Sequence, residues 1–423
     1  MCAARHLSAQ HPRIRTTVYE QASCVGGTWV FTENIGKDQN GLPVHSSMYK
    51  NLRTNLPKEV MAFPDFAFPD HKDTSFLHHS EVLEYLETYK KHFDLEKLIK
   101  FNTVVSRVNP VVTENNTKWE VTTKCLKTEK NVTNFFDSVM VCNGHYSVPV
   151  IPTIPGIERF SGSFIHSHDY RTPEQYQGES VLILGGGASG TDICIELSQH
   201  AAQVYLSHNN PLLTTRLPPN VAQVRGVESC IGQSGFLLTD GSKVQCTSVI
   251  LATGYEYTFP FLSENCKISV ENRRVQALYK HFLSIEHPTL CFVGIPVQIC
   301  PFPQFDLQIR YFVKLLTGQA KQPTKDEMYA DTQREMEWKK NNLDMPEKYF
   351  HKMGALQWKY NKEIAELGNL EPIPNGVENL YNAVHERRKT NLPDYKKDSY
   401  CLIGSDGYSG NIFVPEKGTY RKI

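Results

Sequence analysis

The chain has 423 residues, 40% of them hydrophobic, which is enough to bury a large core and to form more than one domain. Lys plus Arg number 45, as do Asp plus Glu, so no overall positive charge attracts nucleic acid or an anionic membrane. The longest apolar stretch, TLCFVGIPVQIC, contains Gly and Pro and is shorter than the ~20 residues of a membrane span. The composition predicts a globular protein without a membrane span and without nucleic acid as a partner.

The 11 cysteines include no CxxC pair and no Cys/His cluster at the spacing of zinc ligands. They lie mostly in apolar segments, such as those around Cys246 and Cys291, so we expect reduced, buried thiols and no metal site. Because reduced thiols are typical of the cytoplasm, we expect the protein to be cytoplasmic.

The first predicted elements are a helix in MCAARHL, with small and apolar residues at helical spacing, and a strand in TTVYEQ that ends at Glu20. In a dinucleotide-binding βαβ unit, an acidic residue after the second strand binds the adenosine ribose, about 20 residues beyond a GxGxxG loop. Counting back places that loop just before Met1. We therefore expect that ~15 residues, one strand and the loop, are missing ahead of the helix.

The next segments predict a loop, a helix and two strands. VGGTW begins a polar, Asn- and Gly-rich stretch that reaches about Tyr49, and loops of that length usually bind a ligand. HSEVLEYLETYKKHF has the helical period, with Ser80 as the expected N-cap. KWEVTTKC and FDSVMVCNG predict strands, and Pro149, Pro152 and Pro155 mark a domain boundary.

SVLILGGGASGTDICIELSQHAAQVYLS predicts a strand, a glycine-rich turn, a helix and a second strand. Gly185, Gly187 and Gly190 occupy the three positions of GxGxxG, and Ala188 and Ser189 open the helix. Glycines permit a tight turn and a close approach of the backbone, so that the helix N-terminus can hold a pyrophosphate. We expect a dinucleotide here, with a ligand-free turn as the less favoured alternative.

The second strand of this unit has no acidic residue at its end, where an NAD site would carry one. Ser207 and His208 stand there instead, with Arg216 further on, and these side chains suit a 2′-phosphate. The pattern favours NADPH over NADH. A later strand in KVQCTSVILATGY closes the unit, and LQIRYFVKLLTG and DEMYADTQREMEWKK predict helices.

Several of these segments resemble the flavin-containing monooxygenases. VYEQASCVGGTW is similar to the flavin-adenine-dinucleotide segment of that family, and FSGSFIHSHDY fits its FxGxxxHxxxY fingerprint through His166 and Tyr170. TNLPKEVMAFPDFAFP resembles the family's Asn-containing loop, LATGY resembles its strand-end motif, and residues 301–308 continue the likeness. The resemblance covers most of the chain and is nearest to the shorter, glucosinolate S-oxygenase-like members.

The resemblance implies an α/β fold with two nested Rossmann-like dinucleotide-binding domains. An FAD-binding domain would comprise residues 1–156 and 291–423, and an inserted NADPH-binding domain would comprise residues 157–290. Without the family resemblance, a single histidine such as His166 is more often a structural or domain-linking residue than a catalytic one.

The resemblance also implies site residues. Glu20 would bind the adenosine ribose of FAD, Thr28 and Trp29 would lie along the flavin, and Val105 would meet the adenine through its backbone. Asn55, beside the isoalloxazine, would bind both flavin and NADP⁺ and is the residue expected to act in chemistry. The full set of expected cofactor-binding residues is Glu20, Gly26, Gly27, Thr28, Trp29, Asn55, Leu56, Val105, Gly185, Gly187, Ala188, Ser189, Gly190, Ser207, His208, Arg216, Thr253, Gly254 and Gln308.

The activity implied is N- or S-oxygenation of a soft nucleophile, a tertiary amine or a thioether. NADPH would reduce FAD, O₂ would add to form a C4a-hydroperoxyflavin, and its distal oxygen would pass to the substrate. No acid–base triad is needed for this reaction. The residues leave open the substrate, the choice between nitrogen and sulfur, and the oligomeric state.

Two alternatives stay open. A Baeyer–Villiger monooxygenase would resemble FxGxxxHxxxW followed by Pro or Asp, whereas Tyr170 is followed here by Arg171. A truncated, non-catalytic isoform that cannot hold FAD would follow from the expected absence of the first phosphate loop. The colour of the purified protein separates this second alternative, because bound flavin is yellow.

Overall fold

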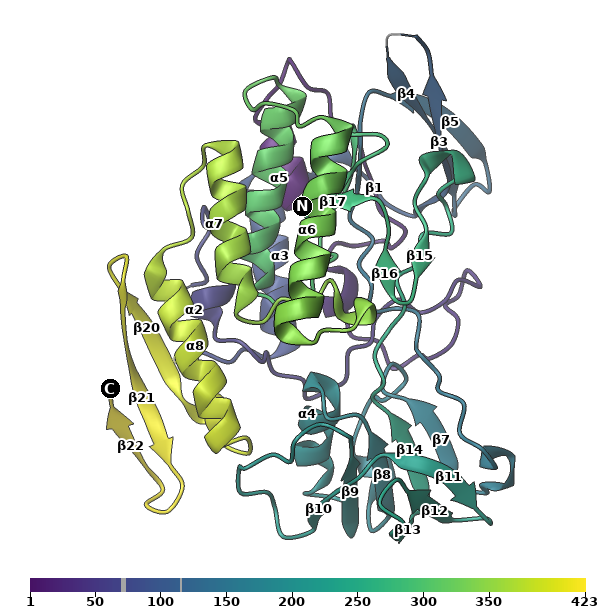
Figure 1. Ribbon diagram of the computed structural model, residues 1–423, viewed down its shortest axis with the longest axis vertical. Helices are drawn as coiled ribbons and strands as arrows, with labels where there is room; N and C mark the ends of the chain where they lie inside the picture. The colour runs from purple at the N-terminus through teal and green to yellow at the C-terminus, as the bar shows by residue number, and fades with distance from the viewer. Residues whose placement is uncertain (70–73, 115) are drawn as a thin grey trace.

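The molecule consists of two α/β lobes joined along one side by the C-terminal residues (Figure 1). The computed structural model describes residues 1–69, 74–114 and 116–423. The lower lobe in Figure 1 is formed by the middle of the chain, from β7 (Ser163–His166) to β14 (Ser248–Leu251). The upper lobe contains segments that precede and follow it, so one α/β unit is inserted in the other. This confirms the predicted fold class.

A five-stranded parallel sheet forms the centre of the lower lobe, in the order β10-β9-β8-β14-β7. Alternate residues of β8 pack on opposite faces: Val181 and Ile183 contact α4, whereas Leu182 and Leu184 contact the small antiparallel sheet β11-β12-β13. Because both faces are covered, the strand is apolar throughout, as its sequence indicates. The further bounds are β8 (Ser180–Leu184), α4 (Ala188–Leu197), β9 (Gln203–Ser207), β10 (Val221–Val224), β11 (Val227–Ile231), β12 (Gly235–Leu238) and β13 (Lys243–Gln245).

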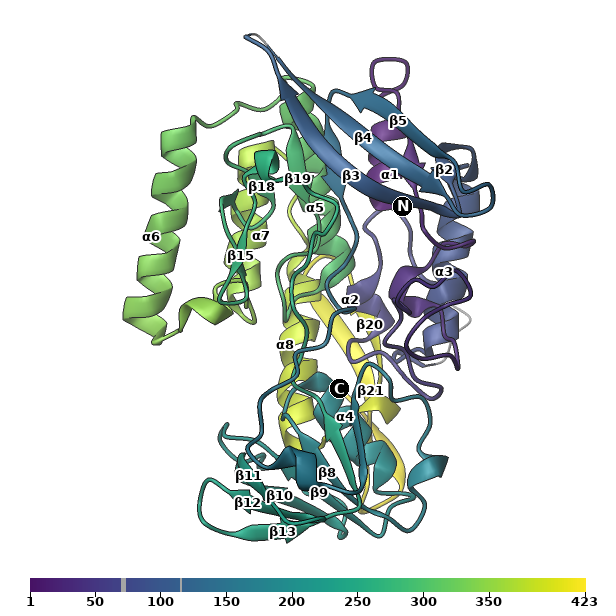
Figure 2. The same ribbon diagram turned by 90° about the vertical axis from the view of Figure 1, so that its right-hand side faces the viewer.

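The strands of the upper lobe form several smaller sheets. The order β17-β18-β19-β6 joins the end of the N-terminal segment to strands that follow the lower lobe, and β1 pairs in parallel with β2. The hairpin layer β3-β4-β5 lies at the top of Figure 2. The bounds are β1 (Val18–Tyr19), β2 (Ile99–Lys100), β3 (Thr103–Val112), β4 (Thr117–Cys125), β5 (Asn131–Phe136), β6 (Val139–Val141), β15 (Val270–Glu271), β16 (Arg274–Val275), β17 (Leu278–Tyr279), β18 (Leu283–Ser284) and β19 (Leu290–Phe292).

Helices surround these sheets, and the C-terminal strands form a sheet of their own against α8. The helices are α1 (Cys2–Ser8), α2 (Lys58–Met61), α3 (His79–His92), α5 (Pro301–Leu316), α6 (Lys325–Leu343), α7 (Leu356–Gly368) and α8 (Asn375–Thr390). The C-terminal sheet contains β20 (Ser399–Ile403), β21 (Gly407–Val414) and β22 (Thr419–Lys422). Short 3₁₀ turns are η1 (Gly27–Trp29), η2 (Glu96–Leu98), η3 (Ile157–Arg159), η4 (Glu174–Tyr176), η5 (Glu264–Cys266), η6 (Glu347–Tyr349) and η7 (Tyr395–Lys397). In the described part of the chain, no helix has the length and apolarity to cross a bilayer.

The structure corrects the N-cap expected for α3. The N-cap is His78 and not Ser80, because the His78 ring accepts a hydrogen bond from the Ser80 N–H while Glu81 accepts one from the His78 N–H. This reciprocal pair is a capping box, with an imidazole in the place of the usual hydroxyl. The helix therefore begins at His79.

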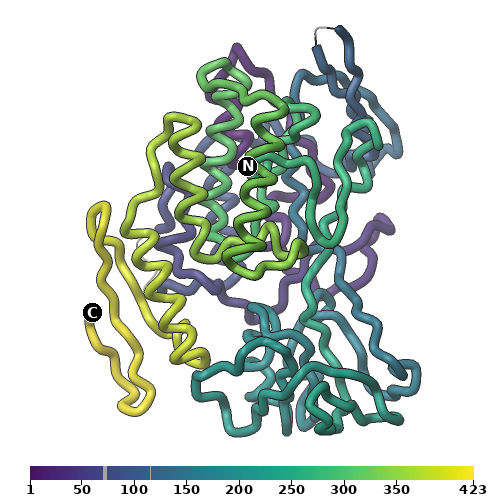
Figure 3. Tube along the Cα trace, in the orientation of Figure 1, coloured from purple at the N-terminus to yellow at the C-terminus, as the bar shows by residue number. Residues whose placement is uncertain are grey.

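Two antiparallel connections join the lobes, close together in Figure 3. Residue Val150 N–H donates to Gly254 O at 2.9 Å, and the Thr253 hydroxyl donates to Val150 O at 2.5 Å. The chain therefore returns to the upper lobe directly after β14. Strands β17 and β18 belong to a sheet of that upper lobe. The expected boundary at residue 290 stays a prediction, and the strand pairing favours an earlier one.

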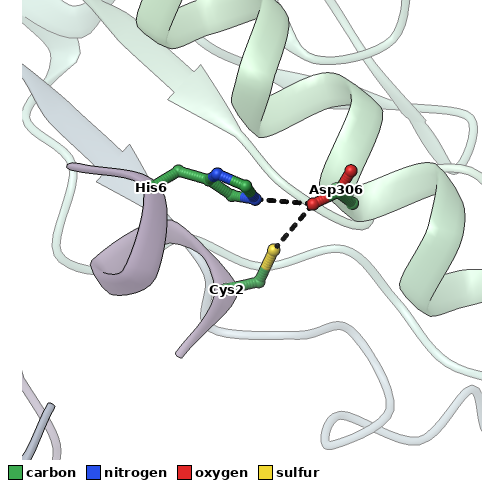
Figure 4. A group of neighbouring side chains, drawn as sticks. All are labelled: Cys2, His6 and Asp306. Atoms are coloured by element: carbon green, nitrogen blue, oxygen red, sulfur yellow. Dashed lines mark hydrogen bonds and ion pairs between the residues drawn. The ribbon is translucent and has the colours of Figure 1, made fainter. Parts of the chain in front are cut away.

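A buried polar group ties α1 to α5 (Figure 4). The Asp306 carboxylate is 2% exposed and contacts His6 Nε2 at 2.6 Å, while its other oxygen contacts Arg310 at 3.4 Å. The Cys2 thiol donates to the same carboxylate at 3.7 Å, and burial raises the pKa of this thiol well above its usual value. The protonated thiol and the paired carboxylate act as a tether between helices.

Two buried histidines form a hydrogen-bonded chain in the upper lobe. Val275 N–H donates to His351 Nε2 at 3.0 Å, so the His351 proton lies on Nδ1 and is donated to His281 Nδ1 at 2.9 Å. The His281 Nε2–H in turn donates to Glu335 at 2.9 Å. Lys339 contacts the same Glu335 oxygen at 2.7 Å. The chain is complete when both imidazoles are neutral.

Acid is expected to destabilise the fold through this pair. Burial lowers the pKa of His281, against the opposing effect of Glu335, and burial lowers the pKa of His351 well below its usual value. The unfolded chain protonates both below about pH 6.5, so the stability is present above that pH and is lost as the pH falls towards the folded-state values. The free energy of unfolding should fall by up to about 1.4 kcal/mol per pH unit for each histidine. Urea titrations at pH 7.5 and 5.5 measure this loss, and a His351→Gln variant with the same loss as wild type would contradict the assignment.

Candidate active site

The expected dinucleotide residues of the lower lobe lie along one edge of its sheet. Because all five strands are parallel, their carboxyl ends share that edge, where a ligand of such a sheet binds. Gly185 follows β8, Ser207 ends β9 and Thr253 follows β14, while the fingerprint residue His166 ends β7. His166 and Thr253, which are 87 positions apart in the sequence (253 − 166), therefore lie at the same edge of the sheet.

The glycine turn has the geometry that its sequence indicates. Gly185 has φ +127°, and a Cβ on Gly190 would lie 1.8 Å from the Gly185 carbonyl oxygen, so neither position accepts a side chain. Gly187 is different: its φ is −80°, and apart from its chain neighbours no atom of the described residues lies within 4 Å of an added Cβ. No side chain caps the N-terminus of α4, which Ala188 and Ser189 open. The first N–H groups of this helix are thus free to bind an anion.

His208 and Ser207 have different surroundings at the end of β9. His208 is buried against Gly186, and neither of its ring nitrogens has a hydrogen-bond partner among the described residues. The Ser207 hydroxyl, in contrast, donates to Arg225 O at 2.8 Å. His208 therefore retains the capacity to bind a ligand group, whereas the Ser207 hydroxyl holds the neighbouring strand end in place.

Arg225 is a functional candidate that sequence reasoning missed. It follows β10 directly, and β10 pairs in parallel with β9 with Val224 opposite Ser207, so its backbone lies beside the expected ribose position. Its side chain is exposed. Arg216 is also exposed, but its neighbour Thr215 accepts a hydrogen bond from Leu392 N–H, towards the C-terminal segment. The sequence signal that could have identified Arg225 is a basic residue at the end of the strand that follows VYLS.

Glu20 has the position and environment expected of a ribose ligand. It follows β1 directly, its N–H donates to Lys100 O at 3.0 Å, and one carboxylate oxygen accepts from Ala22 N–H at 2.8 Å. Partial burial raises the pKa of the Glu20 carboxyl.

The VGGTW segment forms a tight turn against α3. Gly26 has φ +124°, and a Cβ there would lie 2.3 Å from a methyl group of Leu83, so only glycine fits. Gly27 has φ +53° with open space beside it, and Thr28 accepts a hydrogen bond from Ser46 through its backbone. Trp29 packs against the core between α1, α3 and α5. The exposed backbone at Gly27 can approach a ligand closely.

Three further residues that the sequence predicts to bind cofactor, Val105, Leu56 and Gln308, lie in different surroundings. Val105 precedes a register shift in the β3–β4 pairing, which interrupts the strand ladder there and suits contact through the backbone. Leu56 packs partly buried next to Asn55. Gln308 is fully buried in α5, where Nε2 donates to Tyr360 at 2.7 Å, so this residue is tied to α7.

Asn55 is half-buried in the loop before α2, and Tyr395 donates a hydrogen bond to its Oδ1 at 3.0 Å. The loop is fixed because Thr54 N–H donates to Leu77 O and Leu77 N–H donates to the Thr54 hydroxyl. With the carbonyl oxygen of the amide engaged, its N–H₂ group remains to donate to a ligand.

The residues that follow β6 lie close to the junction of the lobes. The Tyr146 side chain is 46% exposed, and Cys142 is exposed as well. His145 Nε2 is buried there without a partner, and burial lowers the pKa of His145 to about 4. This unpartnered nitrogen retains the capacity to bind a polar ligand group.

Comparison with known proteins decides the family. Residues 9–213 and 210–373 match the family described as flavin-binding monooxygenase-like. The chain belongs to this family. It is 34% identical over 450 residues to the flavin-containing monooxygenase FMO GS-OX-like 2 of Arabidopsis thaliana, covering 100% of this chain and 94% of the relative.

Solved structures agree with this membership. The S-allyl-L-cysteine S-oxygenase of Allium sativum is 33% identical, with a TM-score of 0.85 over 93% of this chain and 92% of that one. Tmm of Pelagibacter sp. strain HTCC7211 is 28% identical, with a TM-score of 0.82 over 96% and 92% of the two chains. As a member of this family, the chain is an enzyme that uses FAD and NADPH. Its substrates are O₂ and a small molecule.

Proposed function

We propose that this monooxygenase S-oxygenates a small thioether. The observation that carries the choice of sulfur is the 33% identity and 0.85 TM-score with an S-oxygenase, over nearly the full length of both chains. We assign NADPH to the edge of the lower sheet and FAD to the upper lobe, around Glu20, the Gly26–Gly27 turn and His145.

When bound, the reduced flavin supplies the activation of O₂ and the oxygen transfer. The residues of the chain bind the two cofactors and orient them. The free N–H groups of α4 receive the pyrophosphate of NADPH, and Glu20 holds the ribose of FAD. Asn55 donates its amide hydrogens where the two cofactors meet, and the surrounding apolar residues exclude water.

A substrate comparison tests the proposal. The purified enzyme with added FAD and NADPH is given S-allyl-L-cysteine, a tertiary amine and a cyclic ketone in separate reactions, and the products are measured by mass spectrometry. We expect the sulfoxide to form fastest. Preferred formation of the N-oxide would overturn the choice of sulfur, and conversion of the ketone to a lactone would favour the Baeyer–Villiger alternative.

Arg225 should determine the preference for NADPH over NADH. Because a guanidinium pairs with a phosphate through charge-assisted hydrogen bonds, Arg225→Ala should raise KM for NADPH about tenfold and leave KM for NADH unchanged. Arg216→Ala is the matched control, since Arg216 is also exposed but lies in the segment beside Leu392. Steady-state NADPH and NADH oxidation measures both constants. A larger effect of Arg216→Ala would return the 2′-phosphate contact to the residue expected from the sequence.

A further inference from the structure

A C-terminal tyrosine contacts the residue expected to act in chemistry. The Tyr395 hydroxyl donates to Asn55 Oδ1 at 3.0 Å, across 340 positions of the sequence. The Tyr395 ring is 2% exposed and meets Phe76 edge to face, with ring centroids 5.2 Å apart. Burial raises the pKa of this phenol, so the hydroxyl keeps its proton and donates at any physiological pH. The ring is therefore held in one position with a donor directed at the amide.

The residues beside Tyr395 contact the other lobe. Lys396 forms an ion pair with Asp192 of α4 and also donates to Arg53 O at 3.0 Å, two residues before Asn55. Arg388 donates to the Thr191 hydroxyl of α4 at 2.8 Å. Figure 2 shows α8 passing from the upper lobe down to α4, which places this segment between the lobes. One short stretch of chain thus holds both the Asn55 loop and the helix whose N-terminus is assigned to NADPH.

We propose that Tyr395 is a positioning residue, which fixes the side-chain amide of Asn55 so that its N–H₂ group faces the nicotinamide cofactor. The inference rests on the proposed role of Asn55 in NADP⁺ binding. An amide has an oxygen and a nitrogen of nearly equal size, so only its hydrogen-bond partners decide which of the two faces a ligand. Tyr395 engages the oxygen and so selects the orientation in which the nitrogen donates. Lys396 and Arg388 hold this arrangement against α4.

The test compares Tyr395→Phe with Tyr400→Phe. Tyr400 packs on the same Phe76 ring and its hydroxyl contacts Asp398 at 3.3 Å, so its variant removes a buried hydroxyl of the same core without touching Asn55. Calorimetric titration of NADP⁺ into the oxidised, FAD-loaded protein gives the Kd, and the thermal midpoint checks the fold. We expect Tyr395→Phe to raise the Kd about fivefold, the value of one lost hydrogen bond, and Tyr400→Phe to leave it unchanged.

A double-mutant cycle with Asn55→Ser shows whether the effect acts through Asn55. Tyr395→Phe should raise the Kd in the wild-type background and change it by less than about twofold in the Asn55→Ser background. If Tyr395→Phe changes the Kd equally in both backgrounds, the positioning role is wrong. It is also wrong if Asn55→Ser weakens NADP⁺ binding but Tyr395→Phe alone leaves the Kd at the wild-type value. A wild-type Kd in Asn55→Ser would overturn the role of Asn55 and the inference together. Sulfoxide formation by the wild type reports on the proposed function separately.

Discussion

Asn55→Ser should lower the rate of sulfoxide formation by about 100-fold, the effect of removing one preorganised hydrogen-bond donor from a reacting centre. The amide lies in a loop that is fixed through Thr54 and Leu77, and Tyr395 engages its oxygen. A serine hydroxyl is too short to replace the N–H₂ group at the same position. Because the N-terminus of α4, which is assigned to NADPH, is unchanged in this variant, NADPH oxidation should continue with release of hydrogen peroxide. Product analysis by mass spectrometry and a peroxide assay measure the two outcomes.

Asn51→Ser is the control for this variant. Asn51 precedes Asn55 by four residues, is exposed, and donates to Glu196 of α4 at 2.9 Å. Its loss removes an amide from the same segment without changing the amide that Tyr395 holds. We expect wild-type rates of sulfoxide formation for Asn51→Ser. If Asn55→Ser also forms sulfoxide at the wild-type rate, the catalytic role of Asn55 is wrong.

Gly187→Ala should separate cofactor binding from folding. Apart from its chain neighbours, an added Cβ at this position meets no atom within 4 Å in the part of the chain that the structure describes, and φ of −80° suits any residue. The free energy of unfolding should therefore change by less than about 1 kcal/mol. The space is the one that a pyrophosphate needs when it approaches the backbone. The Kd for NADPH should therefore rise at least about tenfold, as measured by calorimetry.

Gly190→Ala is the contrasting variant, because its Cβ would lie 1.8 Å from the Gly185 carbonyl oxygen. It should destabilise the lower lobe by about 3 kcal/mol, whether or not a cofactor is present. Thermal unfolding and NADPH titration of both variants give the comparison. A Gly187→Ala protein that binds NADPH with the wild-type Kd would show that the turn does not hold the pyrophosphate.

The local elements could be predicted from the sequence because short-range patterns determine them. β8, the glycine turn, α4 and β9 follow one another in the apolar run and the GGGASG motif, and the structure has them as expected. The helical period of α3 was also sufficient, but its N-cap was not, because a histidine ring rather than a hydroxyl caps it. A capping residue depends on side-chain geometry that the residue type does not fix.

The contacts that complete the site could not be predicted, because they join distant segments. The Arg225 backbone lies beside the end of β9 only because β10 pairs with β9, and VAQV is a weak strand signal. Tyr395 meets Asn55 across 340 positions, and nothing in DYKKDSY indicates that contact. The pairing of β17 and β18 with the upper sheet likewise depends on tertiary packing, and no local sequence pattern indicates it.

We propose that this chain transfers one atom of O₂ to a small thioether at the expense of NADPH. The direct measurement is the reaction of the FAD-loaded enzyme with S-allyl-L-cysteine and NADPH under ¹⁸O₂, with mass spectrometry of the product and spectrophotometry of NADPH. A sulfoxide that carries a single ¹⁸O atom should form, with NADPH oxidised in proportion. A sulfoxide whose oxygen comes from water, or NADPH oxidation that yields hydrogen peroxide and leaves every offered thioether unchanged, would contradict it.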